Sequence, residues 1–191
     1  FLFKFCECWT TSAKHEYKFE NTNLTVGGKI NSDLRANTTD YSAYGRYLSD
    51  DSKLSLNGSL AGNNDGLNSI SLDGSYRPSD TANYSASYSH NFDTGRHNLD
   101  MMAQKSYGDL TLRGRQNLQY GGETGFESNT SALAAYKLNN DLSIIGGGEY
   151  HYDQDGGSLR PQAGIQYKEI PIVITYDPEN QSTSVGIVLK F

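Results

Sequence analysis

The sequence has little of what marks the common soluble and helical membrane classes. Only 36% of its 191 residues are hydrophobic, and it has one Trp and four Pro. No apolar run approaches the roughly 18 residues that a transmembrane helix needs, which excludes a helical membrane protein. The chain has 16 Lys and Arg and 22 Asp and Glu, and its basic residues form no cluster. We therefore do not expect nucleic acid as a partner.

Cysteine and histidine are also scarce. Cys6 and Cys8 are one residue apart, and a disulfide between them would close a small, strained ring. The four histidines have no zinc-site spacing, so we predict no metal site and no cofactor. There is no starting Met and no basic leader. If Phe1 is the mature terminus, a signal peptide has already been removed.

The sequence is rich in tyrosine and phenylalanine, and its apolar and polar residues alternate. The 14 Tyr and 7 Phe argue against disorder, because disordered chains are poor in aromatic residues. From about Tyr41 onward, apolar residues alternate with small polar ones, as in Leu54, Leu56 and Leu60. This period of two is typical of strands with one apolar and one polar face.

The alternation predicts about twelve strands, with boundaries uncertain by roughly 2–4 residues. They are 16–30, 39–48, 53–61, 69–77, 81–92, 96–106, 109–118, 129–138, 141–152, 158–168, 170–176 and 182–191. The first is irregular, because Tyr17 has odd and Leu24 even parity. A bulge near Asn21–Asn23 would reconcile them, whereas a turn there would change the strand count.

The connections between these strands sort by length. A short set alternates with a mostly longer set, as bacterial outer-membrane barrels alternate short periplasmic turns with longer outer loops. An even number of strands then places both termini on the periplasmic side. We therefore predict an all-β fold: a closed antiparallel up-and-down transmembrane β-barrel over residues 15–191, preceded by an apolar segment, 1–14. A soluble β-barrel with a ligand cavity is the alternative architecture.

The end of the chain adds a resemblance. Val185, Ile187, Leu189 and Phe191 alternate up to a final aromatic residue, and this run resembles the C-terminal strand of outer-membrane β-barrel proteins. The resemblance implies location in the outer membrane of a Gram-negative bacterium, with lipopolysaccharide and the barrel-assembly machinery as partners. Small twelve-stranded channels, such as oligosaccharide-specific porins, are similar in length and strand number.

Strand parity places a set of polar side chains in the barrel lumen. These pore-lining candidates are Lys53, Asp73, Arg77, Asp100, Arg113, Arg115, Glu149, His151, Arg160, Gln166 and Lys168. Both signs of charge occur, which favours weak or mixed ion selectivity. Arg113 and Arg115 form the densest basic pair and could bind an anionic solute, although solvated lumen charges are the default interpretation.

Two further features lie at the margins of the strands. Several tyrosines fall near predicted strand ends, where barrels carry interfacial aromatic girdles. They are Tyr76, Tyr88, Tyr107, Tyr120, Tyr136, Tyr152, Tyr167 and Tyr176. The apolar N-terminal segment, with Phe1, Phe3, Phe5 and Trp9, could be an anchor, a lumen plug or a contact for an envelope protein partner.

Three functions fit these patterns. The first is a non-enzymatic channel for small polar solutes. The second is a structural subunit that anchors a larger envelope complex through the N-terminal segment. The third is a lipid-modifying enzyme, for which His90 beside Ser89, or His151 with Glu149 and Asp153, are the candidate residues. We favour the channel, because no catalytic signature stands out among so many serines.

Overall fold

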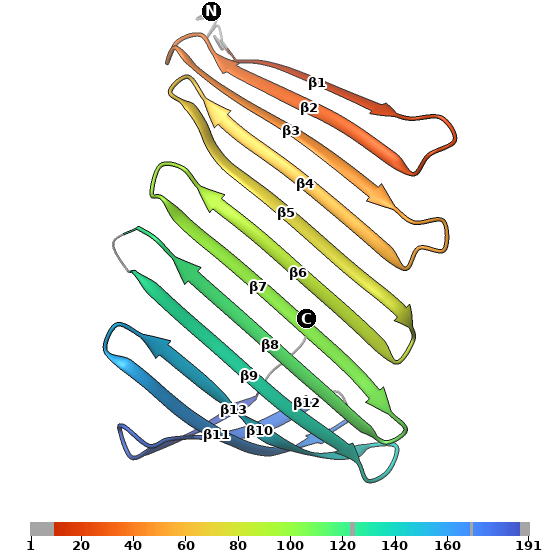
Figure 1. The fold of residues 1–191 in the computed structure, drawn as a ribbon, viewed down its shortest axis with the longest axis vertical. Helices are drawn as coiled ribbons and strands as arrows, with labels where there is room; N and C mark the ends of the chain where they lie inside the picture. Colours follow the sequence, from red (N-terminus) through yellow and green to blue (C-terminus); the bar gives the residue numbers. More distant parts are fainter. Residues whose placement is uncertain (1–9, 123–124, 169, 188–191) are drawn as a thin grey trace, which may run out of the picture.

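The chain forms one antiparallel β-sheet. The structure is a computed structural model and describes residues 10–122, 125–168 and 170–187. Each strand pairs with the next along the chain (Figure 1). The thirteen strands are β1 Thr10–Lys18, β2 Leu24–Asp33, β3 Thr38–Leu48, β4 Leu54–Asn63, β5 Gly66–Ser79, β6 Ala82–Asn91, β7 Arg96–Tyr107, β8 Leu110–Tyr120, β9 Phe126–Lys137, β10 Leu142–Asp153, β11 Gly156–Tyr167, β12 Ile170–Asp177 and β13 Ser182–Ile187.

The pairing register follows the alternation in the sequence. Between β4 and β5, Leu54 pairs with Tyr76 and Leu60 with Ile70 on one face, while Ser59 pairs with Ser71 on the other. A shift of one residue would move each apolar side chain to the polar face, so the pattern specifies the register. Tight turns close the hairpins, as at Gly108, where φ is 58°.

The region predicted as one strand, 16–30, is two strands. β1 and β2 form a hairpin around Phe19–Asn23, closed by a backbone hydrogen bond from Phe19 N–H to the Leu24 carbonyl at 3.1 Å. Asn21 has a φ of 58°, a left-handed conformation that asparagine tolerates well. The parity break therefore marks a turn rather than a bulge. β1 also begins at Thr10, inside the segment predicted to precede the barrel.

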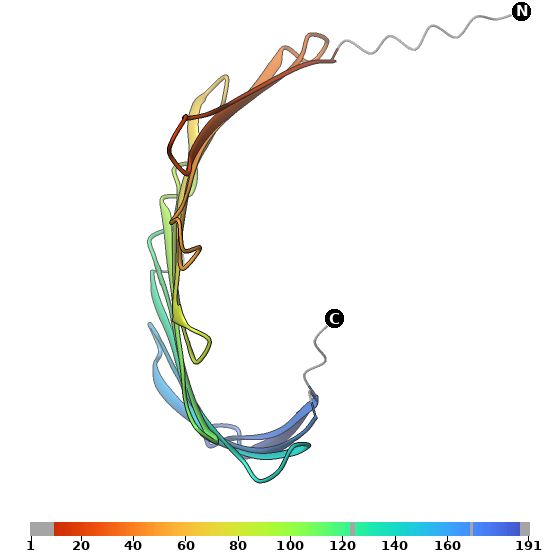
Figure 2. The same cartoon turned by 90° about the vertical axis from the view of Figure 1, so that its right-hand side faces the viewer.

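The turn changes the strand count and the positions of the chain ends. With thirteen strands instead of about twelve, β1 and β13 run in the same direction. The start of β1 at Thr10 and the end of β13 at Ile187 consequently lie at opposite ends of the strands. The even strand count, on which the prediction of a shared side for both termini rests, is therefore wrong for the described residues. In the described residues β1 and β13 are not paired with each other. The sheet is a deep open trough (Figure 2).

The strand ends form two rims. Rim A carries the turns that follow β1, β3, β5, β7, β9 and β11, and rim B carries the others; they are the right and left margins of Figure 1. The predicted difference in loop length between rims is wrong. On rim A, Phe19–Asn23 and Ser49–Lys53 have five residues each, whereas on rim B Asn64–Asp65 and Gln154–Asp155 have two each. Strands continue through Ser, Asn and Asp residues that resemble loop sequence, since backbone pairing does not require apolar side chains.

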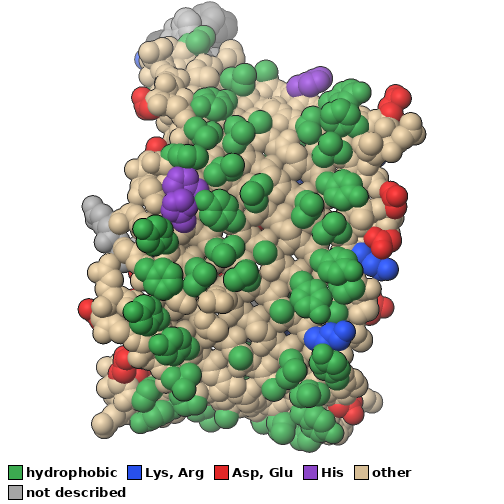
Figure 3. All heavy atoms as spheres, viewed as in Figure 1, with side chains coloured by type: hydrophobic (Ala, Val, Ile, Leu, Met, Phe, Trp, Pro, Cys, Tyr) green, Lys and Arg blue, Asp and Glu red, His purple; other side chains and the backbone are tan. Residues whose placement is uncertain are grey.

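The two faces of the sheet differ sharply. The convex face carries the hydrophobic side chains, with charged ones near its margins (Figures 2 and 3); we call it the apolar face and the concave one the polar face. Ala82 is the one buried hydrophobic residue among those described, whereas Leu72 is 53% and Tyr120 64% exposed. A soluble domain buries its apolar face against a second layer. This sheet has no such core in its described part.

Candidate transport surface

The polar face gathers the residues predicted to line a lumen. The candidates within strands lie on the same face of the sheet as Ser71 and Ser131, as the strand pairing shows. Lys53 and Lys168 lie in turns on rim A. On the strands, β5 contributes Asp73 and Arg77, β7 Asp100, β8 Arg113 and Arg115, β10 Glu149 and His151, and β11 Arg160 and Gln166. Cross-strand pairs such as Ser55–Ser75 and Asn57–Asp73 fill the space between them. Small polar side chains leave this surface open to water.

Arginines on β8 are held by partners on β7. Arg115 donates from Nε and Nη2 to Asp100 Oδ2, at 3.0 and 2.8 Å. Asn117 donates to the same oxygen at 3.4 Å. Arg113 binds an uncharged partner, donating to Gln104 Oε1 at 3.1 and 2.8 Å. Arg115 is thus neutralised locally while Arg113 keeps its positive charge, which separates the predicted basic pair.

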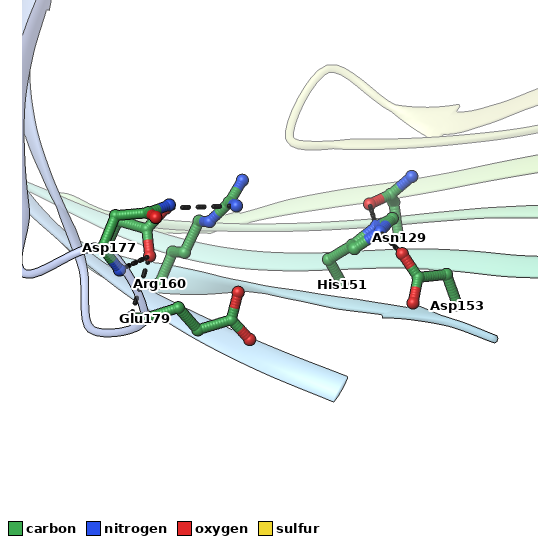
Figure 4. A network of polar contacts seen from close by, with 7 residues as sticks. Asn129, His151, Asp153, Arg160, Asp177 and Glu179 are labelled. Carbon is green, nitrogen blue, oxygen red and sulfur yellow. Dashed lines mark hydrogen bonds and ion pairs between the residues drawn. The ribbon is translucent and has the colours of Figure 1, made fainter. Parts of the chain in front are cut away.

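A second network lies near rim B (Figure 4). His151 Nδ1 is 2.6 Å from Asn129 Oδ1, and its Nε2 is 3.0 Å from Asp153 Oδ2. Arg160 pairs with Asp177 at 3.2 Å. Because both imidazole nitrogens of His151 are occupied, neither is available to take a proton from a serine. The arrangement is that of a polar wall rather than a catalytic triad.

A hollow of about 380 Å³ lies between these networks on the polar face. Its lining includes Arg115, Asn129, Ser131, Glu149 and Gln162. The lining mixes one cation, one anion, amides and a hydroxyl, so it can hydrogen-bond with a polar solute without selecting one charge sign. Among the described residues no group of three or more His, Cys, Asp or Glu side chains is arranged to hold a metal ion.

Sequence reasoning missed several members of these networks. Gln104, Asn117, Asn129 and Asp177 are not among the predicted pore-lining residues, although their strand parity places them on the polar face. Parity could have found them if amides had been weighed with charges. Leu189, Phe191, Phe1, Phe3, Phe5, Trp9, Cys6 and Cys8 lie outside the described residues, whereas Val185 and Ile187 are on β13.

His90 and His97 lie on the apolar face, away from this surface. The two rings pair across β6 and β7 and stack at a centroid distance of 3.9 Å. Tyr88 Oη is 2.9 Å from His97 Nδ1. Ser89 faces the opposite side of the sheet from His90, since consecutive strand residues alternate. The predicted pairing of Ser89 with His90 is therefore wrong.

The tyrosines predicted to form girdles also lie on the apolar face. Tyr107, Tyr136 and Tyr167 are near rim A, and Tyr120 and Tyr152 near rim B. Between these two bands the face carries small residues, including Ala103, Gly114, Ala132, Gly146 and Ala163. On β9 and β10 the apolar face is therefore banded, with large side chains near both margins and small ones in the middle.

The height of this banded face can be estimated along β9. Phe126 and Tyr136 mark its two ends on the apolar face. At about 3.4 Å per residue they are roughly 34 Å apart along the strand. With the tilt of about 45° that is usual in membrane barrels, the height is about 24 Å, close to the apolar belt of about 25 Å in such barrels.

Rim A carries one carboxyl with a perturbed pKa outside the strands. The Ser49 hydroxyl donates to Asp51 Oδ1 at 2.7 Å, and the Lys53 backbone N–H donates to the same oxygen at 3.1 Å. These hydrogen bonds, with the ion pair to Lys53 at 3.3 Å, hold the pKa of Asp51 below its ordinary value. The turn thus keeps a negative charge beside Lys53.

No helix in the described part of the chain is both long and apolar enough to cross a membrane. No protein-family model matches the chain, and no curated protein matches it either. Among solved structures, a KdgM porin is similar at 14% identity and a TM-score of 0.36, over 83% of this chain and 91% of the porin. A KdgM porin in complex with disordered oligogalacturonate is similar at 15% identity, with the same TM-score and coverage. The likeness to these porins is distant.

Proposed function

We propose that this protein is an outer-membrane β-barrel that lets small polar solutes diffuse across the membrane. One observation carries the proposal: a single-layer sheet has an exposed apolar convex face (Figures 2 and 3), and the strand parity of its polar and charged residues places them on the concave face. Such a sheet is stable in lipid only if it closes, because unpaired backbone groups are costly in hydrocarbon. Closure would turn the polar face into a water-filled lumen.

The apolar belt supports a membrane rather than a soluble setting. Its estimated height of about 24 Å matches the bilayer belt of known barrels. Tyrosines at both margins suit the head-group region, where the hydroxyl meets water and the ring meets lipid. Lys105 lies on the same face near rim A, with its Nζ 5.7 Å from the Tyr107 ring, and can reach the interface. Lipid and lipopolysaccharide would cover this face, and the barrel-assembly machinery would insert it.

The polar face favours transport over catalysis. Ser and Asn side chains line much of it, and the hollow beside Arg115 and Glu149 offers both charges and amides. Both imidazole nitrogens of His151 contact other side chains, and His90 faces the opposite side of the sheet from Ser89. A passive channel needs only an open, hydrogen-bonding wall.

Single-channel recording tests the proposal. Purified, refolded protein is added to a planar lipid bilayer, and the current is recorded after samples are shown to be folded by heat-modifiable gel migration. We expect discrete conductance steps that depend on folded protein. A folded band without any conductance would contradict the channel, and a protein that stays monodisperse without detergent would contradict the membrane barrel.

A further inference from the structure

The charges on the polar face are sorted by rim. On the strands near rim A, the polar face carries four cations that lie in no ion pair within the described residues: Lys18, Arg46, Arg113 and Lys137, which we call the basic set. All four side chains are exposed. Glu16 on β1 also lies on this face, where it is ion-paired with Lys14 at 3.5 Å and accepts a hydrogen bond from Tyr44. Two more cations on this side, Lys53 and Arg77, are paired with turn residues Asp51 and Asp80, at 3.3 and 3.4 Å.

The strands near rim B carry the opposite sign. The acidic set consists of Asp33, Asp40, Glu127, Asp153 and Asp177. Asp33, Asp153 and Asp177 are the last residues of β2, β10 and β12, while Asp40 and Glu127 lie close to the starts of β3 and β9. The acidic set therefore surrounds one mouth of the trough as the basic set surrounds the other.

Other charges do not cancel this contrast. Near rim B the described strands also carry three cations on the polar face. Arg160 pairs with Asp177, and Arg96 hydrogen-bonds to Gln119. Lys29 on β2 lies in no ion pair within the described residues and lines the same hollow as Asp40. These three cations offset only part of the five-residue acidic set. Turns on both rims are acidic. At rim B the turn acids, such as Asp65 and Asp155, add to the wall charge, whereas at rim A they lie outside the basic set. The middle of the wall is mixed, as in the Arg115–Asp100 pair at 2.8 Å.

We infer that the lumen is polarised along its axis and that the channel rectifies, passing more current when the acidic mouth faces the positive electrode. The inference rests on the proposed channel function and adds a directional selectivity to it. Cations concentrate at the acidic mouth and anions at the basic mouth. A voltage that drives the cations from the acidic mouth and the anions from the basic mouth into the pore raises the ion concentration in its middle, and the current is high. The reverse voltage draws both ions out of the middle, and the current is low.

This prediction differs from simple mixed selectivity. A lumen with evenly mixed charges would pass both ions weakly and equally in both directions. Separation along the axis gives little net preference for either ion but a strong dependence on the sign of the voltage. Salt should abolish it, because the Debye length falls from about 10 Å at 0.1 M to about 3 Å at 1 M.

Current–voltage curves of single channels test the inference. In about 0.1 M KCl we expect the currents at opposite voltages to differ at least about twofold, and the ratio to approach one in about 1 M KCl. Each inserted channel is recorded alone, because channels of opposite orientation would cancel the asymmetry.

Two independent variants reduce the two charge sets. R46Q/R113Q/K137Q neutralises three of the four residues of the basic set. D40N/E127Q neutralises the two residues of the acidic set whose side chains have no hydrogen-bond or ion-pair partner among the described residues. Each should reduce the ratio at low salt, and the reversal potential in a KCl gradient should shift toward cation preference in the first and anion preference in the second. K105Q is the matched control: Lys105 is near rim A but on the apolar face, so the ratio should not change.

The outcomes separate the two proposals. A conducting protein with symmetric currents at low salt would overturn the polarised lumen and leave the channel intact. Rectification that survives both variants, or that K105Q abolishes, would also overturn it. Absence of conductance from folded protein would overturn the channel, and the inference with it. A ratio that falls in both charge variants but not in K105Q supports it.

Discussion

At the scale of single residues, two adjacent glycines on β10 face different surroundings. A Cβ on Gly147, which faces the polar side, would lie 2.1 Å from the Ala132 carbonyl oxygen and 2.9 Å from Leu133 Cα. A Cβ on Gly146, which faces the apolar side, would meet nothing within 4 Å. The sheet bends sharply through β9 to β11 (Figure 2), which crowds the concave side there.

We expect Gly147→Ala to destabilise the folded sheet by about 1–3 kcal/mol, the usual cost of overpacking. The backbone of β9 cannot move away without breaking its pairing with β10. Gly146→Ala is the matched control and should change stability little. Urea titration of protein folded into lipid vesicles measures both, and equal stability of the two variants would show that the bend is not crowded.

The Ser49–Asp51 contact predicts a pH dependence in the rim A turn. Because the pKa of Asp51 is lowered in the folded protein, the stabilisation is present above the ordinary pKa and is lost as pH falls through the folded value. Ser49→Ala should raise the pKa of Asp51 toward the ordinary value, since the hydroxyl is its largest perturbation. A carboxyl NMR titration checks this, and an unchanged midpoint would contradict it.

At the scale of the strand, β9 shows how one element serves two environments. Ala132 lies on the apolar face near the middle of the belt, and its neighbour Ser131 lines the polar hollow. We expect Ala132→Lys to cost about 2–4 kcal/mol, as a cation facing the bilayer midplane does. Ser131→Lys should cost much less, because water would solvate it.

Folding of both variants into vesicles compares the two faces directly. Reversible urea titrations give the difference in free energy, and the far-UV spectrum confirms that each variant folds. Equal tolerance of lysine at Ala132 and Ser131 would mean that the convex face of β9 does not meet lipid.

Alternation predicted β3 to β13 because apolar and small polar residues change strictly along them. It failed between β1 and β2, where Asn21 makes a turn that polar, strand-like sequence on both sides conceals. It also failed at the connections, since Ser and Asn residues continue the strands. Strand parity predicted which charged residues lie on the polar face. It did not predict their contacts with Gln104 and Asn129, because these contacts depend on the register between neighbouring strands.

At the scale of the whole molecule, closure decides whether the trough is a channel. β1 and β13 are the two edges of the described sheet and run in the same direction. Exposed edges promote edge-to-edge aggregation, and lipid forbids them. We therefore expect the protein in lipid to be a closed barrel in which each edge strand is paired.

Hydrogen exchange in lipid nanodiscs tests closure. Backbone amides of β1 and β13 should be protected to a similar degree as those of β7, which lies inside the sheet. In an open sheet, alternate amides of an edge strand lack partners and exchange far faster. Rapid exchange confined to β1 and β13 would show that the sheet stays open.

The central claim, that the convex face meets lipid and the concave face meets water, is tested most directly by a spin-label scan of β9. Cys6 and Cys8 are replaced by serine, and single cysteines are placed along Phe126–Lys137 in vesicles. Oxygen accessibility should peak at even-numbered positions such as Ala132 and Ala134, and accessibility to a polar nickel reagent at odd-numbered positions such as Ser131 and Leu133. Accessibility without a period of two, or nickel accessibility equal on both faces, would contradict the membrane barrel.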